Sequence, residues 1–405
     1  MSYKKTSFFI PVWYDDYLSV RDFYKENGQW QEVKDIVPRY LFGYVSEIAE
    51  NKELFSAFSL KALPDVFMCS DEISLAHPPV LEGVRISLFS TGAGFLEFTV
   101  AYPHSSLREM ADFAYLFKKA TRGLGKELPE GSVTLYDCAV SLLPTNTEAR
   151  IFFTRKADFK YECLCYHTAL LDKAEDDLSR QLLLLSRNYN NVFTDFSQES
   201  EYDMIYEPYH YDHWAGSPEG LINVTVKTGD HNTDFFLENF KSSHLAVDFH
   251  FLYLMLLNQR FSAIQYIHKI SSLSNGTQKE LEALNARIVK LKTVFSFKIV
   301  SDDQIFQNVY TKMYSTLDID RLLEDIKDNE AQMKQLLSIS SVKTDKLSSK
   351  FLLGISILSL FSVLIDATQF FDRLNLPVSA TLLGFICTLG VSAVYFLWLF
   401  FSRNK

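Results

Sequence analysis

Two long apolar segments near the C-terminus constrain the fold of this chain more than any other feature. They span residues 351–371 and 380–401, and each is about the length of a membrane-crossing helix, which needs roughly 20 residues. The more polar sequence DRLNLPVS separates them at residues 372–379. The sequence therefore predicts a hairpin of two transmembrane helices joined by a short outer loop.

Basic residues beside the two segments predict how this hairpin is oriented. Lysines at 343, 346 and 350 precede the first segment, and Arg403 and Lys405 follow the second. Basic residues favour the cytosolic side of a membrane. We therefore expect a multi-pass protein of the cell inner (plasma) membrane, with its N-terminus and the tail at 402–405 both in the cytosol.

The first apolar segment carries polar side chains at helical spacing. They fall within an arc of about 140° on a helix, so several copies around an axis would turn one polar face inward. Acidic residues within a membrane are costly and usually functional, and a ring of carboxylates attracts cations. In the alternative interpretation, the serines bond to their own helix backbone and Asp366 pairs with Arg373. The expected pore-lining residues are Ser356, Ser359, Ser362, Asp366 and Gln369.

Residues 1–230 predict a cytosolic α/β regulatory domain. Two strand-like runs surround the turn sequence STGAG and indicate a β-hairpin. The sequence SLREMADFAYLFKKA has helical periodicity, whereas SVTLYDCAVSLL and FKYECLCYHTALL alternate as strands do.

Residues 231–350 predict long helices instead. Residues 231–300 form an apolar helical region, and apolar residues at three-four spacing continue through 301–350, which contain no proline or glycine. We expect one stalk helix at 301–350 that leads into the first membrane helix. The predicted fold class is an α/β cytosolic domain followed by a long helical stalk and a C-terminal two-helix transmembrane hairpin.

This order of parts resembles the CorA-like family of two-transmembrane cation channels. The resemblance covers FKIVSDDQIFQNVYTKMYSTLDIDRLLEDIKDNEAQMKQ and both apolar segments. It implies a homopentamer, a pore lined by the first membrane helix, gating by the cytosolic domain and a divalent cation such as Mg²⁺. The family carries a Gly-Met-Asn signature in its outer loop, but this loop reads FFDRLNLP and lacks the Gly and Met. Asp372 and Asn375 are the outer-loop residues that we take as its site.

The segment YEPYHYDHW is a candidate for a regulatory ligand site. It places histidine, aspartate and aromatic residues close together, and aromatic rings can stack on a nucleobase. Metal ligation is another chemistry open to the same groups. The other interpretation is an ordered surface loop. The candidate residues are His210, Asp212, His213 and Trp214.

An acidic run on the predicted stalk is a candidate for metal sensing. Such a run is usually a solvated helix face. The resemblance to the CorA-like family implies instead that acids of the stalk form metal sensors between subunits. The candidates are Asp318, Asp320, Asp325 and Asp328.

Charge and motifs narrow the class of function. The net charge of -10 argues against direct nucleic-acid binding, and the absence of a nucleophile–base motif argues against an enzyme. The leading hypothesis is an oligomeric cation channel gated by its cytosolic domain. One alternative is a CRISPR-associated antiviral membrane effector opened by a nucleotide second messenger, and another is a membrane-anchored enzyme. The expected partners are the lipid bilayer, further copies of the chain, and a small-molecule or nucleotide ligand.

Overall fold

The structure of the protein is a computed structural model. In it, the chain divides into two compact units. The first unit comprises residues 1–275 and 282–330, and the second comprises 276–281 and 331–405. The residues that the structure describes are 3–34, 36–64, 78–119, 133, 135–145, 148–151, 163–189, 204–272 and 277–329.

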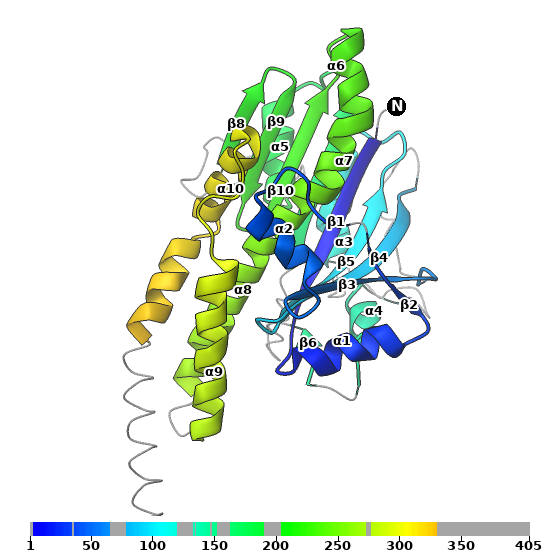
Figure 1. The fold of residues 1–405 in the computed structure, drawn as a ribbon. Helices are drawn as coiled ribbons and strands as arrows, with labels where there is room; N and C mark the ends of the chain where they lie inside the picture. Colours follow the sequence, from blue (N-terminus) through cyan, green and yellow to red (C-terminus); the bar gives the residue numbers. More distant parts are fainter. Residues whose placement is uncertain are drawn as a thin grey trace, which may run out of the picture. The chain divides into compact units, whose positions relative to one another are not determined.

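A ten-stranded mixed sheet forms the centre of the first unit (Figure 1). The strand order is β2-β3-β4-β5-β1-β7-β10-β9-β8, and β6 pairs with the end of β1. Neighbouring strands are antiparallel except β7 and β10, which run parallel. The strands are β1 (Tyr3–Trp13), β2 (Trp30–Glu32), β3 (Phe55–Leu60), β4 (Val80–Phe89), β5 (Ala93–Ala101), β6 (Arg150–Ile151), β7 (Leu164–Leu171), β8 (Met204–Tyr209), β9 (Asp212–Ser217) and β10 (Gly220–Val226).

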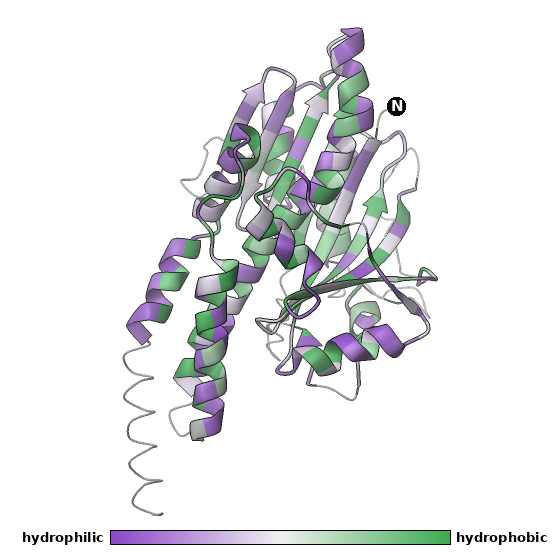
Figure 2. Cartoon of the chain, viewed as in Figure 1, coloured by the Kyte–Doolittle hydropathy of each residue, from purple (hydrophilic) through white to green (hydrophobic). Residues whose placement is uncertain are grey.

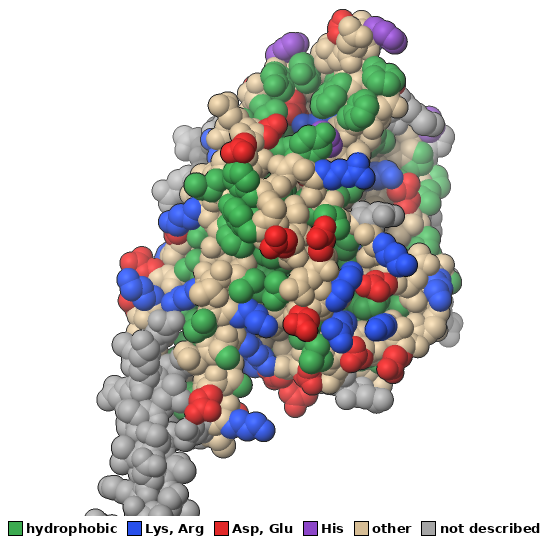
Figure 3. All heavy atoms as spheres, viewed as in Figure 1, with side chains coloured by type: hydrophobic (Ala, Val, Ile, Leu, Met, Phe, Trp, Pro, Cys, Tyr) green, Lys and Arg blue, Asp and Glu red, His purple; other side chains and the backbone are tan. Residues whose placement is uncertain are grey.

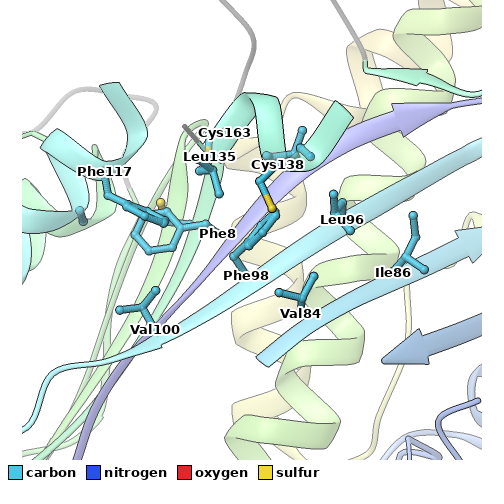
Figure 4. Close-up of a cluster of buried hydrophobic side chains, with 14 of the residues drawn as sticks. Phe8, Val84, Ile86, Leu96, Phe98, Val100, Phe117, Leu135, Cys138 and Cys163 are labelled. Atoms are coloured by element: carbon cyan, nitrogen blue, oxygen red, sulfur yellow. The ribbon is translucent and has the colours of Figure 1, made fainter. Parts of the chain in front are cut away.

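One face of the sheet packs against short helices and holds a large hydrophobic core (Figure 4). Side chains alternate between the two faces of a strand, so Phe8, Ile10 and Val12 of β1 all enter this core. Phe8 meets Phe117 edge to face, with 4.8 Å between ring centroids. The helices among the described residues up to 189 are α1 (Tyr17–Glu26), α2 (Gly43–Glu50), α3 (Leu107–Lys119), α4 (Leu135–Ser141) and α5 (Leu178–Ser186).

The opposite face packs against the long helix α8 (His250–Ser272). The ring of Phe9, on the odd-numbered side of β1, contacts both His250 and Tyr253 of that helix. A helical arm precedes α8, and we use that name for α6 (His231–Phe236), η3 (Leu237–Lys241), α7 (Ser242–His244) and η4 (Leu245–Phe249). The segments η3 and η4 are π-helical, and π-helical turns are rare and often mark functional sites.

Further helices follow α8 along the chain. In α9, hydrophobic and hydrophilic residues alternate along the helix (Figure 2). Phe306 of α10 stacks on Phe249 of the arm, with 4.2 Å between ring centroids. The outer side of the arm instead exposes Phe235, Phe236 and Phe240, and hydrophobic side chains gather at that end of the molecular surface (Figure 3). The remaining elements are α9 (Gln278–Lys290), η6 (Leu291–Phe295) and α10 (Gln304–Thr316).

The predicted fold class and membrane localisation require correction. Within the part of the chain that the structure describes, no helix combines the length and the apolar character needed to cross a bilayer. The structure shows instead a large mixed sheet with helices on both faces. The described structure therefore contradicts two predictions from the sequence, the transmembrane hairpin and the multi-pass inner-membrane localisation. The segments that prompted them, 351–371 and 380–401, lie outside the described residues.

Two local predictions also differ from the structure. SVTLYDCAVSLL was expected to be a strand, but residues 135–141 form α4, because Leu135, Cys138 and Ala139 repeat at helical spacing and are buried together. The expected stalk helix at 301–350 is interrupted in its described part. Helix α10 ends at Thr316, residues 317–318 form a turn, and Asp318 has a positive φ of 54° before helix resumes.

Candidate ligand-binding pocket

A polar pocket opens on the face of the sheet that carries α8. Strands β1, β4, β5 and β7 contribute its floor, and the arm together with the first turn of α8 contributes its side. Its volume is about 400 Å³, within the range of small-molecule sites. Its polar lining residues are Tyr3, Lys5, Ser7, Arg85, Glu97, Thr99, Tyr166, Thr168, Ser242 and His250.

Strand register explains why residues far apart in sequence meet here. Ser7 lies directly opposite Thr99 of β5 and directly opposite Tyr166 of β7. Arg85 of β4 lies opposite Glu97 of β5 in the same way. Directly opposite residues share one face of a sheet, so the alternate positions of four strands form one polar surface.

Glu97 is the central acidic group of the pocket. Its side chain is 4% exposed, and its Oε1 accepts a hydrogen bond from Ser7 Oγ at 2.6 Å. The same Oε1 lies 3.0 Å from His250 Nε2. Burial raises the pKa of Glu97, but His250, Arg85 and Ser7 together outweigh burial and lower that pKa to about 2. Glu97 is therefore an ionised carboxylate at neutral pH.

The second oxygen of this carboxylate is left without a partner. No described residue places a donor within hydrogen-bond distance of Glu97 Oε2, although that atom is buried. A buried acceptor without a hydrogen bond normally costs about 1–3 kcal/mol. Such groups in a native structure require an explanation, and a ligand is one.

Arg85 is the second group with unused hydrogen-bonding capacity. Its side chain lines the pocket and is half-buried. Glu97 is close enough for Arg85 to lower the pKa of that carboxyl, yet Arg85 makes no ion pair or hydrogen bond with any other described residue. Lys5, the other cation of the pocket, forms an exposed ion pair with Glu82 at 2.7 Å. The guanidinium of Arg85 is thus the cation available to an anion in the pocket.

The same face of the sheet holds a second buried ionic network beside the pocket. Asp212 is 1% exposed, and its Oδ2 accepts from Lys241 Nζ at 2.7 Å. Its Oδ1 accepts from Asn223 Nδ2 at 2.6 Å. The Lys241 ammonium also lies over the ring of Trp214, 5.3 Å from its centroid. This network ties the arm to strands β9 and β10.

The expected regulatory site at His210, Asp212, His213 and Trp214 does not assemble into one site. These residues form a hairpin end rather than a loop, because β8 and β9 pair across the turn. Asp212 and Trp214 are buried on the arm side of the sheet. His213 pairs with Glu207 at 3.0 Å, and His210 is exposed in the turn. Asp212 and Trp214 hold the arm in place, while the histidines lie elsewhere.

The acidic residues expected to sense a metal are also separated. Asp318 lies 3.4 Å from Arg321, and Asp320 lies 3.5 Å from Lys298. Asp325 and Asp328 are exposed. Among the described residues, no group of three or more His, Cys, Asp or Glu side chains is placed to hold a metal ion. The arrangement fits the solvated helix face that was the alternative.

The expected pore and outer-loop residues lie outside the described part of the chain. They are Ser356, Ser359, Ser362, Asp366, Gln369, Asp372 and Asn375.

One feature of the sequence points to the pocket and was not among the expected site residues. In GFLEFTVA, which becomes β5, Glu97 and Thr99 interrupt a run that is otherwise apolar on both faces. A carboxylate in a buried strand needs a charged or polar partner, and that need points to a site. The partners themselves come from β1 and α8, so the sequence does not name them.

Comparisons of the chain with protein-family models, with curated proteins and with solved structures give no match. The resemblance to the CorA-like family therefore stays a prediction, and the function rests on the pocket.

Proposed function

We propose that the first unit is a regulatory domain that binds a small polar ligand carrying an anionic group. The observation that carries this proposal is Arg85, whose side chain lines a polar pocket and forms no hydrogen bond or ion pair with another described residue. Arginine binds phosphate and carboxylate groups through two parallel hydrogen bonds. An anion on Arg85 would use donors that the protein itself leaves unused.

The rest of the pocket supports the same class of ligand. Thr99, Thr168 and Ser242 offer hydroxyl groups around the cavity, and hydroxyls can donate to an anion or accept from a sugar. The volume of about 400 Å³ is large enough for a mononucleotide or a sugar phosphate. A nucleotide messenger, one of the hypotheses drawn from the sequence, therefore belongs to this class.

Regulation follows from where the ligand would lie. Ser242, Leu245 and Ala246 of the arm line the pocket opposite the strands. A ligand that contacts both sides stabilises the arrangement in which the arm lies on the sheet, because it binds that arrangement more tightly than any other. The arm in turn contacts α10 through the Phe249–Phe306 stack.

Binding is proposed rather than catalysis because of how Ser7 is held. Its hydroxyl donates to Glu97 and not to His250, so the arrangement of a nucleophile beside a histidine base is not formed. Ion conduction stays an untested prediction and is not the function proposed here.

Calorimetry on the full chain tests the proposal, with inorganic phosphate and adenosine monophosphate as probes. We expect at least one probe to bind, and Arg85→Gln to weaken its binding by about tenfold or more, since a charged hydrogen bond is lost. Arg321→Gln is the matched control, because that arginine is exposed and lies outside the pocket lining. Equal affinity in the parent and in Arg85→Gln, or no binding of either probe, would contradict the proposal.

A further inference from the structure

The carboxylate in the pocket sets a second chemical requirement on the ligand. We infer that the ligand is a zwitterion, whose ammonium or other N–H donor faces Glu97 while its anionic group lies on Arg85. The inference rests on the proposed anion binding and adds to it the identity of a second functional group. It follows from what Glu97 lacks, from its ionisation and from its position next to Arg85.

Glu97 has acceptor capacity that the protein does not use. An ionised carboxylate offers about four acceptor sites. The three contacts with Ser7, Thr99 and His250 all fall on Oε1, and Oε2 has none among the described residues. The side chain is 4% exposed but lines the pocket, so a group that reaches it is one held in the pocket.

The ionised state of Glu97 determines which groups it attracts. Its pKa, lowered to about 2, leaves no proton to donate at neutral pH. A ligand hydroxyl could satisfy Oε2, but an ammonium would also gain from the negative charge of this carboxylate, which is 4% exposed. A second anionic group at this position would be repelled.

The spacing of the two unused groups limits the size of the zwitterion. Arg85 and Glu97 lie directly opposite each other on neighbouring antiparallel strands. Residues in that position have Cβ atoms about 4.5–5.5 Å apart. The two side chains nevertheless form no ion pair with each other, so each keeps hydrogen-bonding capacity that the other does not use. The ligand's opposite charges must therefore be joined by a few bonds, as in an amino acid or an aminoalkyl phosphate.

Lys5 and His250, the other basic side chains of the pocket, leave this pairing intact. Lys5 is paired with Glu82, and His250 is paired with Glu97 through Oε1. The unused pair in the pocket is one cation, Arg85, and one carboxylate oxygen, Glu97 Oε2. A zwitterion adds no net charge to this balance, whereas a simple anion leaves Oε2 without a donor.

Three probes of related structure test the inference by calorimetry on the full chain. O-phosphoethanolamine carries both groups, ethyl phosphate lacks the amine, and ethanolamine lacks the phosphate. We expect O-phosphoethanolamine to bind about tenfold or more tightly than ethyl phosphate, and ethanolamine to bind least. Equal affinity for O-phosphoethanolamine and ethyl phosphate would overturn the zwitterion inference and leave anion binding standing. Binding of none of the three probes would overturn the inference as well, and anion binding is then decided by its own test.

Variants separate the two groups. We expect Glu97→Gln to abolish the preference for O-phosphoethanolamine over ethyl phosphate, because the amine then has no carboxylate to face. Arg85→Gln should weaken both phosphates and leave ethanolamine unchanged. A preference that persists in Glu97→Gln would overturn the role of this carboxylate. The comparison of probes on the parent protein needs no substitution, so a folding defect in a variant leaves the test decisive.

Discussion

Glu97 and Asp212 are buried carboxylates on one face of the sheet; Asp212 pairs with Lys241 of the arm, and Glu97 lies 3.0 Å from His250 Nε2 of α8. Such pairs contribute little net stability when compared with apolar packing, but breaking one is costly because a charge is left buried alone. At the residue scale, these two pairs fix where the arm and α8 lie on the strands. The two carboxylates differ, because both oxygens of Asp212 accept hydrogen bonds, whereas Oε2 of Glu97 accepts none from a described residue.

The Asp212–Lys241 pair is expected to show strong coupling. Lys241→Met should lower the free energy of unfolding by about 3–5 kcal/mol, because Asp212 loses its counter-charge in a buried position. The double variant Asp212→Asn/Lys241→Met should lose much less than the two single variants together, because no buried charge remains. Urea unfolding measures all of these values. Additive losses would show that the two side chains do not interact.

The Glu97 carboxyl is expected to make the free energy of unfolding depend on pH. The pKa of Glu97 in the folded protein lies below its ordinary value of 4.5. Its contribution to the free energy of unfolding is therefore complete when the pH is above 4.5, and it is lost as the pH falls toward 2. The full loss is on the order of 3 kcal/mol. Urea unfolding between pH 6 and pH 3 should therefore show a steeper fall for the parent than for Glu97→Gln. Glu53→Gln, at an exposed position, is the control and should fall as the parent does.

At the element scale, the turn between β4 and β5 depends on its glycine. Gly92 has a φ of +96°, and a Cβ placed there would lie 2.7 Å from the backbone oxygen of Tyr14. Tyr14 N in turn donates to the carbonyl of Gly92 at 3.0 Å, so the turn and the end of β1 hold each other. A side chain at this position meets backbone, which cannot move aside as a flexible side chain could.

Gly92→Ala is expected to destabilise the protein by about 1–3 kcal/mol, because it adds both an unfavourable φ and a close contact. Gly28→Ala is the matched control, since a Cβ there meets nothing within 4 Å and the backbone does not need a positive φ. Thermal unfolding of both variants measures the difference. If the two glycine variants melt at the same temperature, the turn does not require glycine.

Several elements could be predicted from the sequence because their signals are local. The STGAG hairpin became β4 and β5, and the helix over SLREMADFAYLFKKA became α3. The error at α4 arose because a short apolar run fits both the helical and the strand periodicity, and only tertiary packing decides between them. The pocket could not be predicted in this way. Its residues run from Tyr3 to His250, and sequence patterns do not report which strands become neighbours.

At the scale of the whole described unit, aromatic contacts join the layers on the arm side of the sheet. Phe306 is buried and lies against Phe249 at 4.2 Å and Tyr40 at 5.9 Å, measured between ring centroids. Trp214 of the sheet packs against Phe249, with 4.6 Å between ring centroids. One aromatic cluster therefore connects the sheet, the arm, α10 and the segment before α2.

Phe306→Ala is expected to lower the free energy of unfolding by about 3–5 kcal/mol, as truncation of a buried phenylalanine usually does. It should also speed amide hydrogen exchange in η4, because the arm loses its contact with α10. Phe236→Ala is the control, since that ring is exposed on the outer side of the arm, and its effect should stay within about 0.5 kcal/mol. Unchanged exchange in η4 would show that α10 does not hold the arm.

The central position of β1 has a consequence for synthesis on the ribosome. This strand is made first, but its neighbours in the sheet are β5, at residues 93–101, and β7, at residues 164–171. Until those residues emerge, the row of aromatic and aliphatic side chains around Phe8 and Phe9 has no strand to pair with. Contacts so distant in sequence slow folding and leave apolar strands open to association meanwhile. The nascent chain should therefore depend on chaperones until β7 has left the exit tunnel, and a chain truncated before β7 should aggregate.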